Sequence, residues 1–170
     1  MERRRFRVAG HRPILPHRSV ALLEPPWSVS EASLMRTVRF KASHHYRRRE
    51  WSEERNRRTF GASANIHAHD WSVVVTVRGE VDPETGFCVD MMALDRVLRD
   101  EVVEPLEGRE MTEALPEFAE GGRIPTTEEL ARFFFRRLRS RIPGGARLVR
   151  VAVRESDVLA AAYPPEGISG

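Results

Sequence analysis

Two histidines, His67 and His69, stand two residues apart in a stretch that alternates between apolar and polar residues. Side chains two residues apart on a β-strand leave the same face, so both imidazoles can converge on one point. His44 ends an earlier alternating stretch and can reach that point if the two strands pair antiparallel. Three imidazole nitrogens with an open fourth position form the arrangement of a catalytic zinc site. Taken alone, a His-x-His pair is a weak signal, and two ordinary strand histidines are its more frequent explanation.

The alternation itself predicts the strands that must carry these histidines. The first is expected over residues 35–44 and the second over residues 66–80. The charged stretch between them, residues 47–58, is expected to be a loop with one helical turn. Residues 82–86 contain the Asp, Pro and Gly of a tight turn, and residues 87–90 are predicted to continue as a short strand.

Two helices and two further strands are expected after the turn. Apolar residues at helical spacing predict a helix over residues 94–106, and Thr126 followed by acids predicts the start of another that runs to about residue 141. Residues 148–155 and 158–163 are then predicted to be strands. The order β-β-α-α-β-β indicates an α+β fold, an antiparallel four-stranded sheet with both helices on one face.

Composition excludes several classes of protein. The chain of 170 residues is 41% hydrophobic and 31% charged, which is typical of one globular domain. It lacks the run of about 18 apolar residues that a membrane span requires, so no membrane partner is expected. Cys88 is the only cysteine, so an intrachain disulfide and a cysteine-rich metal site are both impossible. These features fit a reducing, cytoplasmic setting.

The positive charge is concentrated at the N-terminus. Residues 1–34 are rich in arginine and proline and carry the whole excess of three positive charges, while the other residues hold 22 basic and 22 acidic groups. A neutral body does not favour nucleic acid as a partner. We expect residues 1–34 to be a disordered tail or the product of an upstream translation start. The folded domain is then expected over residues 35–163, followed by a short tail over residues 164–170.

The histidines belong to a longer series of motifs. The chain carries, in this order, the segments 40–44 (FKASH), 52–56 (SEERN), 60–61 (FG), 67–71 (HAHDW), 76–86 (TVRGEVDPETG), Asp90, 125–131 (PTTEELA) and 151–155 (VAVRE). Together they resemble the 6-pyruvoyl-tetrahydropterin synthase and 6-carboxy-tetrahydropterin synthase family. The resemblance covers about residues 35–163.

This resemblance implies a tunnelling fold whose subunits assemble as a homotrimer or a homohexamer, with sites between subunits and a pterin-like small molecule as substrate. It also implies Zn²⁺ as the cofactor, with His44, His67 and His69 as ligands. Glu155 matches the family's glutamate that binds the pterin ring, where a carboxylate can accept two parallel hydrogen bonds. Thr126 and Thr127 would help to hold the ring, although one of them is equally well explained as a helix cap.

The sequence departs from the family at the positions that transfer protons. Ser63 stands where the family has its catalytic cysteine, and a serine hydroxyl is not ionised near neutral pH without a neighbouring base. Glu107 and Gly108 stand where the family has an aspartate and a histidine, so only a carboxylate remains there. Ser63 and Glu107 are therefore the candidate catalytic residues.

Three hypotheses follow from this combination. The first is a zinc-dependent enzyme whose chemistry differs from the family's usual elimination, with Glu107, or an acid near Glu53 and Glu54, as base. The second is a non-catalytic member that binds a pterin or assembles with an active paralogue. The third is a nucleic-acid or partner-binding protein that acts through the arginine-rich tail.

Overall fold

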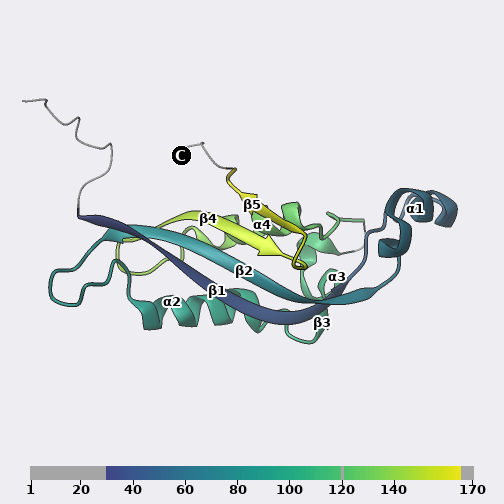
Figure 1. Ribbon diagram of the computed structural model, residues 1–170. Helices are drawn as coiled ribbons and strands as arrows, with labels where there is room; N and C mark the ends of the chain where they lie inside the picture. The colour runs from purple at the N-terminus through teal and green to yellow at the C-terminus, as the bar shows by residue number, and fades with distance from the viewer. Residues whose placement is uncertain (1–29, 120, 166–170) are drawn as a thin grey trace, which may run out of the picture.

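The computed structural model describes residues 30–119 and 121–165, which form one twisted sheet with helices packed against it (Figure 1). Strands β1 (Glu31–His44) and β2 (His67–Glu80) pair antiparallel over their whole length, from Glu31 opposite Glu80 to His44 opposite His67. Strand β4 (Arg147–Arg154) pairs antiparallel with β2, and β5 (Ala160–Tyr163) with β4. The predicted α+β class and the four antiparallel strands are confirmed.

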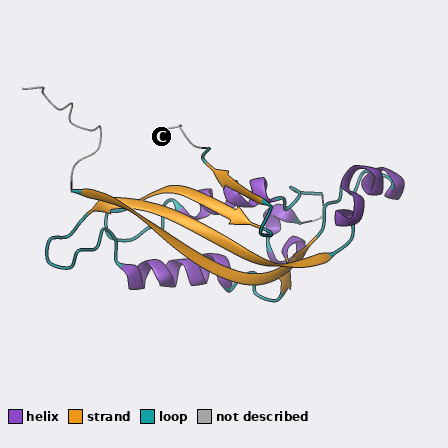
Figure 2. Ribbon diagram, viewed as in Figure 1, coloured by secondary structure: helices purple, strands orange, loops and turns teal. Residues whose placement is uncertain are grey.

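The helices lie on the side of the sheet toward which its apolar side chains point. Figure 2 shows the long strands crossing the molecule, with one helix below them, others beside the shorter strands, and a further helix beyond the far end of the β1–β2 pair. The helical elements are α1 (Glu53–Phe60), η1 (Gly61–Ala64), α2 (Met91–Leu98), η2 (Arg99–Val103), α3 (Met111–Ala114), η3 (Pro116–Phe118) and α4 (Thr127–Leu138).

The core forms between this sheet face and the two longer helices. Every second residue of β2, from Trp71 to Val77, is fully buried, and the residues between them are partly exposed. Leu98 of α2 and Phe134 of α4 are also fully buried in the same cluster. Burying a side chain of this size contributes roughly 1.5–3 kcal/mol. The strand period and the helix period therefore direct their apolar residues to one interior.

The sheet also contains a fifth strand, β3 (Arg109–Glu110), which the sequence pattern did not predict. It pairs parallel with the end of β1, at Ala42 and Ser43. Two residues are too few to show an alternating pattern. The bend before β3 depends on Gly108, whose φ of +70° allows its N–H to reach the carbonyl oxygen of Lys41 at 2.7 Å.

Two strand predictions need correction. Strand β1 begins at Glu31, four residues before its predicted start, because Glu31 to Leu34 continue the pairing with β2. Residues 87–90 are not a strand. They cross over β2 so closely that a Cβ at Gly79 would clash with the carbonyl oxygen of Cys88. Asp90 then caps α2, its side chain accepting from the N–H of Ala93 at 2.9 Å.

The helix predicted over residues 94–106 is formed as α2 followed by one π-helical segment, η2. Its buried residues recur at exact intervals of four: Leu94, Leu98, Val102 and Leu106. In an ideal α-helix such a repeat drifts by about 40° at each step, because one turn takes 3.6 residues. A wider π-turn compensates for this drift and keeps all four side chains facing the core.

The charged loop between β1 and β2 contains a helix of two turns, α1, longer than the single turn predicted. Its N-cap is Ser52, whose hydroxyl accepts from the N–H of Arg55 at 3.2 Å. Asn56 is buried and folds the preceding loop: its side chain accepts from the N–H of Arg48 and donates to the Arg48 carbonyl, both at 2.9 Å. The segment between His44 and His67 thereby leads from the end of β1 back to the start of β2.

Most of the predicted tails, residues 1–29 and 166–170, lies outside the described residues. Among the residues that are described, none of the helices combines the length and the apolar character that crossing a bilayer requires.

Candidate functional site

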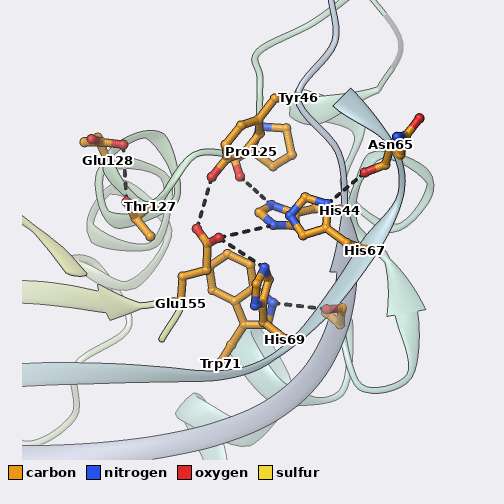
Figure 3. Close-up of polar contacts among 11 residues, drawn as sticks. His44, Tyr46, Asn65, His67, His69, Trp71, Pro125, Thr127, Glu128 and Glu155 are labelled. Carbon is orange, nitrogen blue, oxygen red and sulfur yellow. Dashed lines mark hydrogen bonds and ion pairs between the residues drawn. The ribbon is translucent and has the colours of Figure 1, made fainter. Parts of the chain in front are cut away.

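The three predicted metal-ligating histidines converge where β1 ends and β2 begins. His44 lies directly opposite His67 in the antiparallel pair, and His69 follows on the same face. Together with Glu155 they offer four ligand atoms that all lie within 4.8 Å of one another. Figure 3 shows the three rings and the Glu155 carboxylate pointing toward one another.

Backbone carbonyls set the orientation of two of these rings. Nδ1 of His44 lies 3.0 Å from the carbonyl oxygen of Pro125, and Nδ1 of His67 lies 2.8 Å from that of Asn65. A carbonyl oxygen only accepts hydrogen bonds, so both Nδ1 atoms carry the proton and both Nε2 atoms keep a free lone pair. This is the tautomer that a metal-binding histidine needs, with an outer partner holding the ring in place.

Trp71 forms the floor under the histidines. It is fully buried and donates from Nε1 to the carbonyl oxygen of Ala42 at 3.1 Å. Its ring packs edge-on against the rings of His44 and His69, with centroid separations of 4.8 Å and 5.6 Å. The two imidazoles are therefore packed against a rigid aromatic side chain of the core.

Burial disfavours a second proton on His44. The His44 side chain is fully buried, and this desolvation lowers the pKa of His44 from 6.5 to about 4, with further lowering by His67 and His69. Nε2 of His44 and Nε2 of His69 are buried and have no hydrogen-bond partner within the described residues. Neutral imidazoles with unpartnered lone pairs are the donors that Zn²⁺ prefers, so the residues fit this ion.

Glu155 reaches the cluster from the neighbouring strand. Val153 lies opposite Val73 in the β2–β4 pairing, so Glu155, two residues further on, falls beside Trp71 on the same face. Its Oε1 lies 3.1 Å from Nε2 of His69 and 3.8 Å from Nε2 of His44. The carboxylate is 8% exposed, so it is held inside the site and does not extend into solvent as a strand-end carboxylate would.

Tyr46 is a site residue that the sequence reasoning missed. Its hydroxyl donates to Oε2 of Glu155 at 3.0 Å. Burial, reinforced by the Glu155 carboxylate, raises the pKa of Tyr46 well above its usual value, so the phenol remains a donor. Tyr46 lies two residues after His44, and that spacing was the signal that could have revealed it.

The two threonines lie at the start of α4, next to the histidines. Thr126 caps the helix, accepting from the N–H of Glu129 at 3.3 Å, so the capping role is the one that the structure supports for this residue. Thr127 is buried, and its hydroxyl donates to the Glu128 carboxylate at 3.3 Å. Both lie beside Pro125, whose carbonyl orients His44.

The two candidate catalytic residues lie outside the cluster. Ser63 lies in η1 and is half-buried, and its carbonyl oxygen accepts from the N–H of Tyr46 at 2.7 Å. Within the described residues, its hydroxyl makes no polar contact with the three histidines. Glu107 is exposed at the edge of the sheet, where Oε2 accepts from the backbone N–H of Lys41 at 3.2 Å. Among the described residues, no hydrogen bond or ion pair joins Ser63 to Glu107.

His45 occupies a separate environment from its neighbour His44. Its Nδ1 lies 3.4 Å from Oε1 of Glu110, the last residue of β3, and the His45 side chain is one-fifth exposed. Oε2 of Glu110 accepts from the N–H of Thr112 at 2.9 Å and so caps α3. His45 is therefore a neighbour of the cluster formed by His44, His67, His69 and Glu155, not one of its members.

Comparison with known proteins agrees with this geometry. A model of the family described as 6-pyruvoyl tetrahydropterin synthase matches residues 33–166. The 6-pyruvoyl tetrahydrobiopterin synthase of Homo sapiens is 33% identical over 129 residues, which are 75% of this chain and 87% of the human protein. The dihydroneopterin monophosphate aldolase of Pyrococcus furiosus is 28% identical over 127 residues, 75% of this chain and 92% of that protein.

A solved structure shows the same relationship in three dimensions. The Caenorhabditis elegans 6-pyruvoyl tetrahydropterin synthase matches with a TM-score of 0.70 and 26% identity, covering 78% of this chain and 94% of the nematode chain. The family match extends from residue 33, near the start of β1, to beyond Glu155, and the human relative covers three quarters of the chain. The chain belongs to the 6-pyruvoyl tetrahydropterin synthase family.

Proposed function

We propose that this protein is a zinc-dependent enzyme of the lyase type that acts on a pterin or a related heterocycle. The observation that carries the proposal is the convergence of His44, His67, His69 and Glu155, whose ligand atoms lie within 4.8 Å of one another. The names of the relatives support the substrate class, since the human protein is a tetrahydrobiopterin synthase and the archaeal one an aldolase of dihydroneopterin monophosphate.

Each residue has a distinct task in this proposal. His44, His67 and His69 would hold the ion, which would act as a Lewis acid toward an oxygen of the substrate. Glu155 would bind the amino-pyrimidinone edge of the ring through two hydrogen bonds. The buried Thr127, beside Pro125 at the start of α4, would close the other side of the ring site.

The reaction itself is expected to differ from the family's usual elimination. Ser63 has no base in contact with its hydroxyl within the described residues, and Glu107 is engaged by the backbone of Lys41. Loss of a positioned acid or base typically lowers a rate by about 10²–10⁴. An altered reaction of the same substrate class, with Glu107 or an acid near Glu53 and Glu54 as base, remains part of the proposal.

The second candidate is a non-catalytic member that binds a pterin or assembles with an active paralogue. It is favoured by the same contrast, because the binding residues are complete while neither Ser63 nor Glu107 contacts the cluster. The third hypothesis, binding through the arginine-rich tail, depends mainly on residues outside the described part of the chain.

We further propose assembly on a three-fold axis, as a trimer or a hexamer. Two sheet edges support it. Strand β5 is outermost on one side, and β3 covers β1 only at Ala42 and Ser43 on the other. Long uncovered edges are normally protected by pairing. Light scattering tests this directly, and a monomer at micromolar concentration would contradict it.

Metal analysis and ligand binding test the central proposal. Purified protein should contain one zinc per subunit, and His67→Ala should lose it, while His45→Ala should keep it because His45 lies outside the cluster. Thermal-shift measurements of the zinc-loaded protein with pterins and with deazapurine precursors then test the substrate class. Turnover assays on the compounds that bind separate the enzyme from the binding protein. Protein without stoichiometric metal, unaffected by His67→Ala, would show that the site is wrong.

A further inference from the structure

The Glu155 carboxylate lies where it can serve two incompatible purposes. As a ring anchor it needs both oxygens free for the ligand. In the structure neither oxygen is free, because Oε1 faces the histidines and Oε2 accepts from the Tyr46 hydroxyl at 3.0 Å. One carboxylate therefore cannot occupy both arrangements at once.

The distances place Oε1 among the metal donors. Zinc bonds to imidazole nitrogen and carboxylate oxygen of about 2.1 Å put neighbouring tetrahedral donors about 3.4 Å apart. Oε1 of Glu155 lies 3.1 Å from Nε2 of His69 and 3.8 Å from Nε2 of His44. One distance is slightly shorter and the other slightly longer than that spacing. Neither contact has the geometry of a hydrogen bond, and both nitrogens are without a hydrogen-bond partner in the part of the chain that the structure describes. The three atoms thus lie at separations that donors to a single ion would have.

Tyr46 fixes the carboxylate in this orientation. Its backbone N–H donates to the carbonyl oxygen of Ser63 at 2.7 Å, and its ring meets His44 and Phe60 edge-on at 5.0 Å and 6.1 Å. Both the backbone and the ring of Tyr46 are therefore fixed in position, and this places its hydroxyl against Oε2 of Glu155. With Oε2 bound in this way, Oε1 is directed at the histidines, as Figure 3 shows.

We propose that Glu155, held by the Tyr46 hydroxyl, is the fourth donor of the His44–His67–His69 site in the ligand-free protein, and that a ring-bearing ligand must take it from the metal. This inference rests on the proposed function. Metal and ligand then compete for one carboxylate, so a coordination position is opened only when a ring is bound. Such coupling is reciprocal, and any change that loosens Glu155 from the metal makes it more available to the ligand.

Tyr46→Phe separates this role from a merely structural one. The variant removes one hydrogen bond to Glu155 and keeps the ring packing. Zinc affinity should fall about 10-fold, as expected for an outer-shell partner. Affinity of the zinc-loaded protein for biopterin should rise, or at least not fall, because Glu155 is released. Tyr163→Phe, at the only other tyrosine, is the matched control and should change neither affinity.

Cobalt(II) in place of zinc reports the donors directly, since its visible absorption depends on their number and type. Biopterin should change the spectrum of the wild-type protein. Glu155→Gln should lower metal affinity at least as much as Tyr46→Phe and should give an altered spectrum before any ligand is added. Glu110→Gln, at the carboxylate beside His45, should leave the spectrum unchanged.

The possible outcomes are distinct. The inference is overturned if Glu155→Gln and Tyr46→Phe leave zinc affinity and the cobalt spectrum unchanged while His67→Ala abolishes binding; the zinc site itself would then stand. It is also overturned if Tyr46→Phe weakens metal and biopterin together, since that is the result of general damage to the site. If His67→Ala leaves the metal content unchanged, the proposed function fails first.

Discussion

Acidification of the metal-free protein should destabilise it through His44. Burial lowers the pKa of His44 from 6.5 to about 4, so between these values the unfolded chain binds a proton that the folded chain does not. Stability from the neutral imidazole is fully present above pH 6.5 and is lost as the pH falls toward 4. At pH 5 the loss relative to pH 8 should be about 2 kcal/mol, taking 1.36 kcal/mol for each tenfold change in proton affinity.

Urea unfolding between pH 8 and pH 5, in the presence of a chelator and at one protein concentration, measures this loss. His44→Asn removes the titrating group while its side-chain amide can still donate to the carbonyl oxygen of Pro125. The variant should be less stable at pH 8 but should lose about 2 kcal/mol less than the wild type on going to pH 5. His45→Gln, which changes the partly exposed neighbour, should keep the wild-type dependence. Parallel pH profiles for wild type and His44→Asn would refute the reasoning.

Three further predictions address the fold and the reaction. A chain that starts at Met35 should melt at a lower temperature than one that starts at Ser30. The shorter chain lacks the pairing of Glu31 to Leu34 with β2 and the ion pair of Glu31 with Arg147. Equal melting temperatures would show that this end of β1 contributes nothing to stability. Gly79→Ala should lower the unfolding free energy by about 1–3 kcal/mol, since a Cβ there meets the Cys88 carbonyl; a neutral result in urea unfolding would mean that the crossing segment moves freely. Turnover of dihydroneopterin triphosphate should be at least about 10²-fold slower than in family members that have the cysteine and the aspartate-histidine pair, and a typical rate would show that another group replaces them.

The convergence of the three histidines could be predicted because it depends on short-range regularities. The two-residue period of β2 places His67 and His69 on one face, and the antiparallel pairing brings His44 opposite His67. Glu155 could be placed near a ring only through the family resemblance. Its approach to the histidines depends on the register of β2 against β4, which contains a bulge between Thr76 and Val77. A local pattern carries no information about such a register.

The outer partners of the site could not be predicted for a related reason. The carbonyl oxygens of Pro125 and Asn65 orient two histidines, but any residue has a carbonyl oxygen, so the sequence gives no sign of this role. Strand β3 has only two residues, which are too few to show an alternating pattern. The sequence after Glu80 likewise gives no sign that the segment around Cys88 crosses over Gly79. What was missed is therefore backbone geometry between elements, whereas the elements themselves follow from side-chain periodicity.

The structure also shows where the residues proposed for binding and those proposed for chemistry lie. The residues that would hold metal and ring lie on or next to the paired strands, where the core fixes them. The positions that the resemblance predicts to depart from the family lie in η1, at Ser63, and in the bend before β3, at Glu107 and Gly108. The Glu107 carboxylate and the Gly108 N–H hold the N–H and the carbonyl oxygen of Lys41, at 3.2 Å and 2.7 Å. Gly108 has a φ of +70°, where a residue with a Cβ costs roughly 1–2 kcal/mol. A histidine introduced there has open space around its Cβ but must overcome this cost, so restoring the usual chemistry requires a change of backbone as well as of side chains.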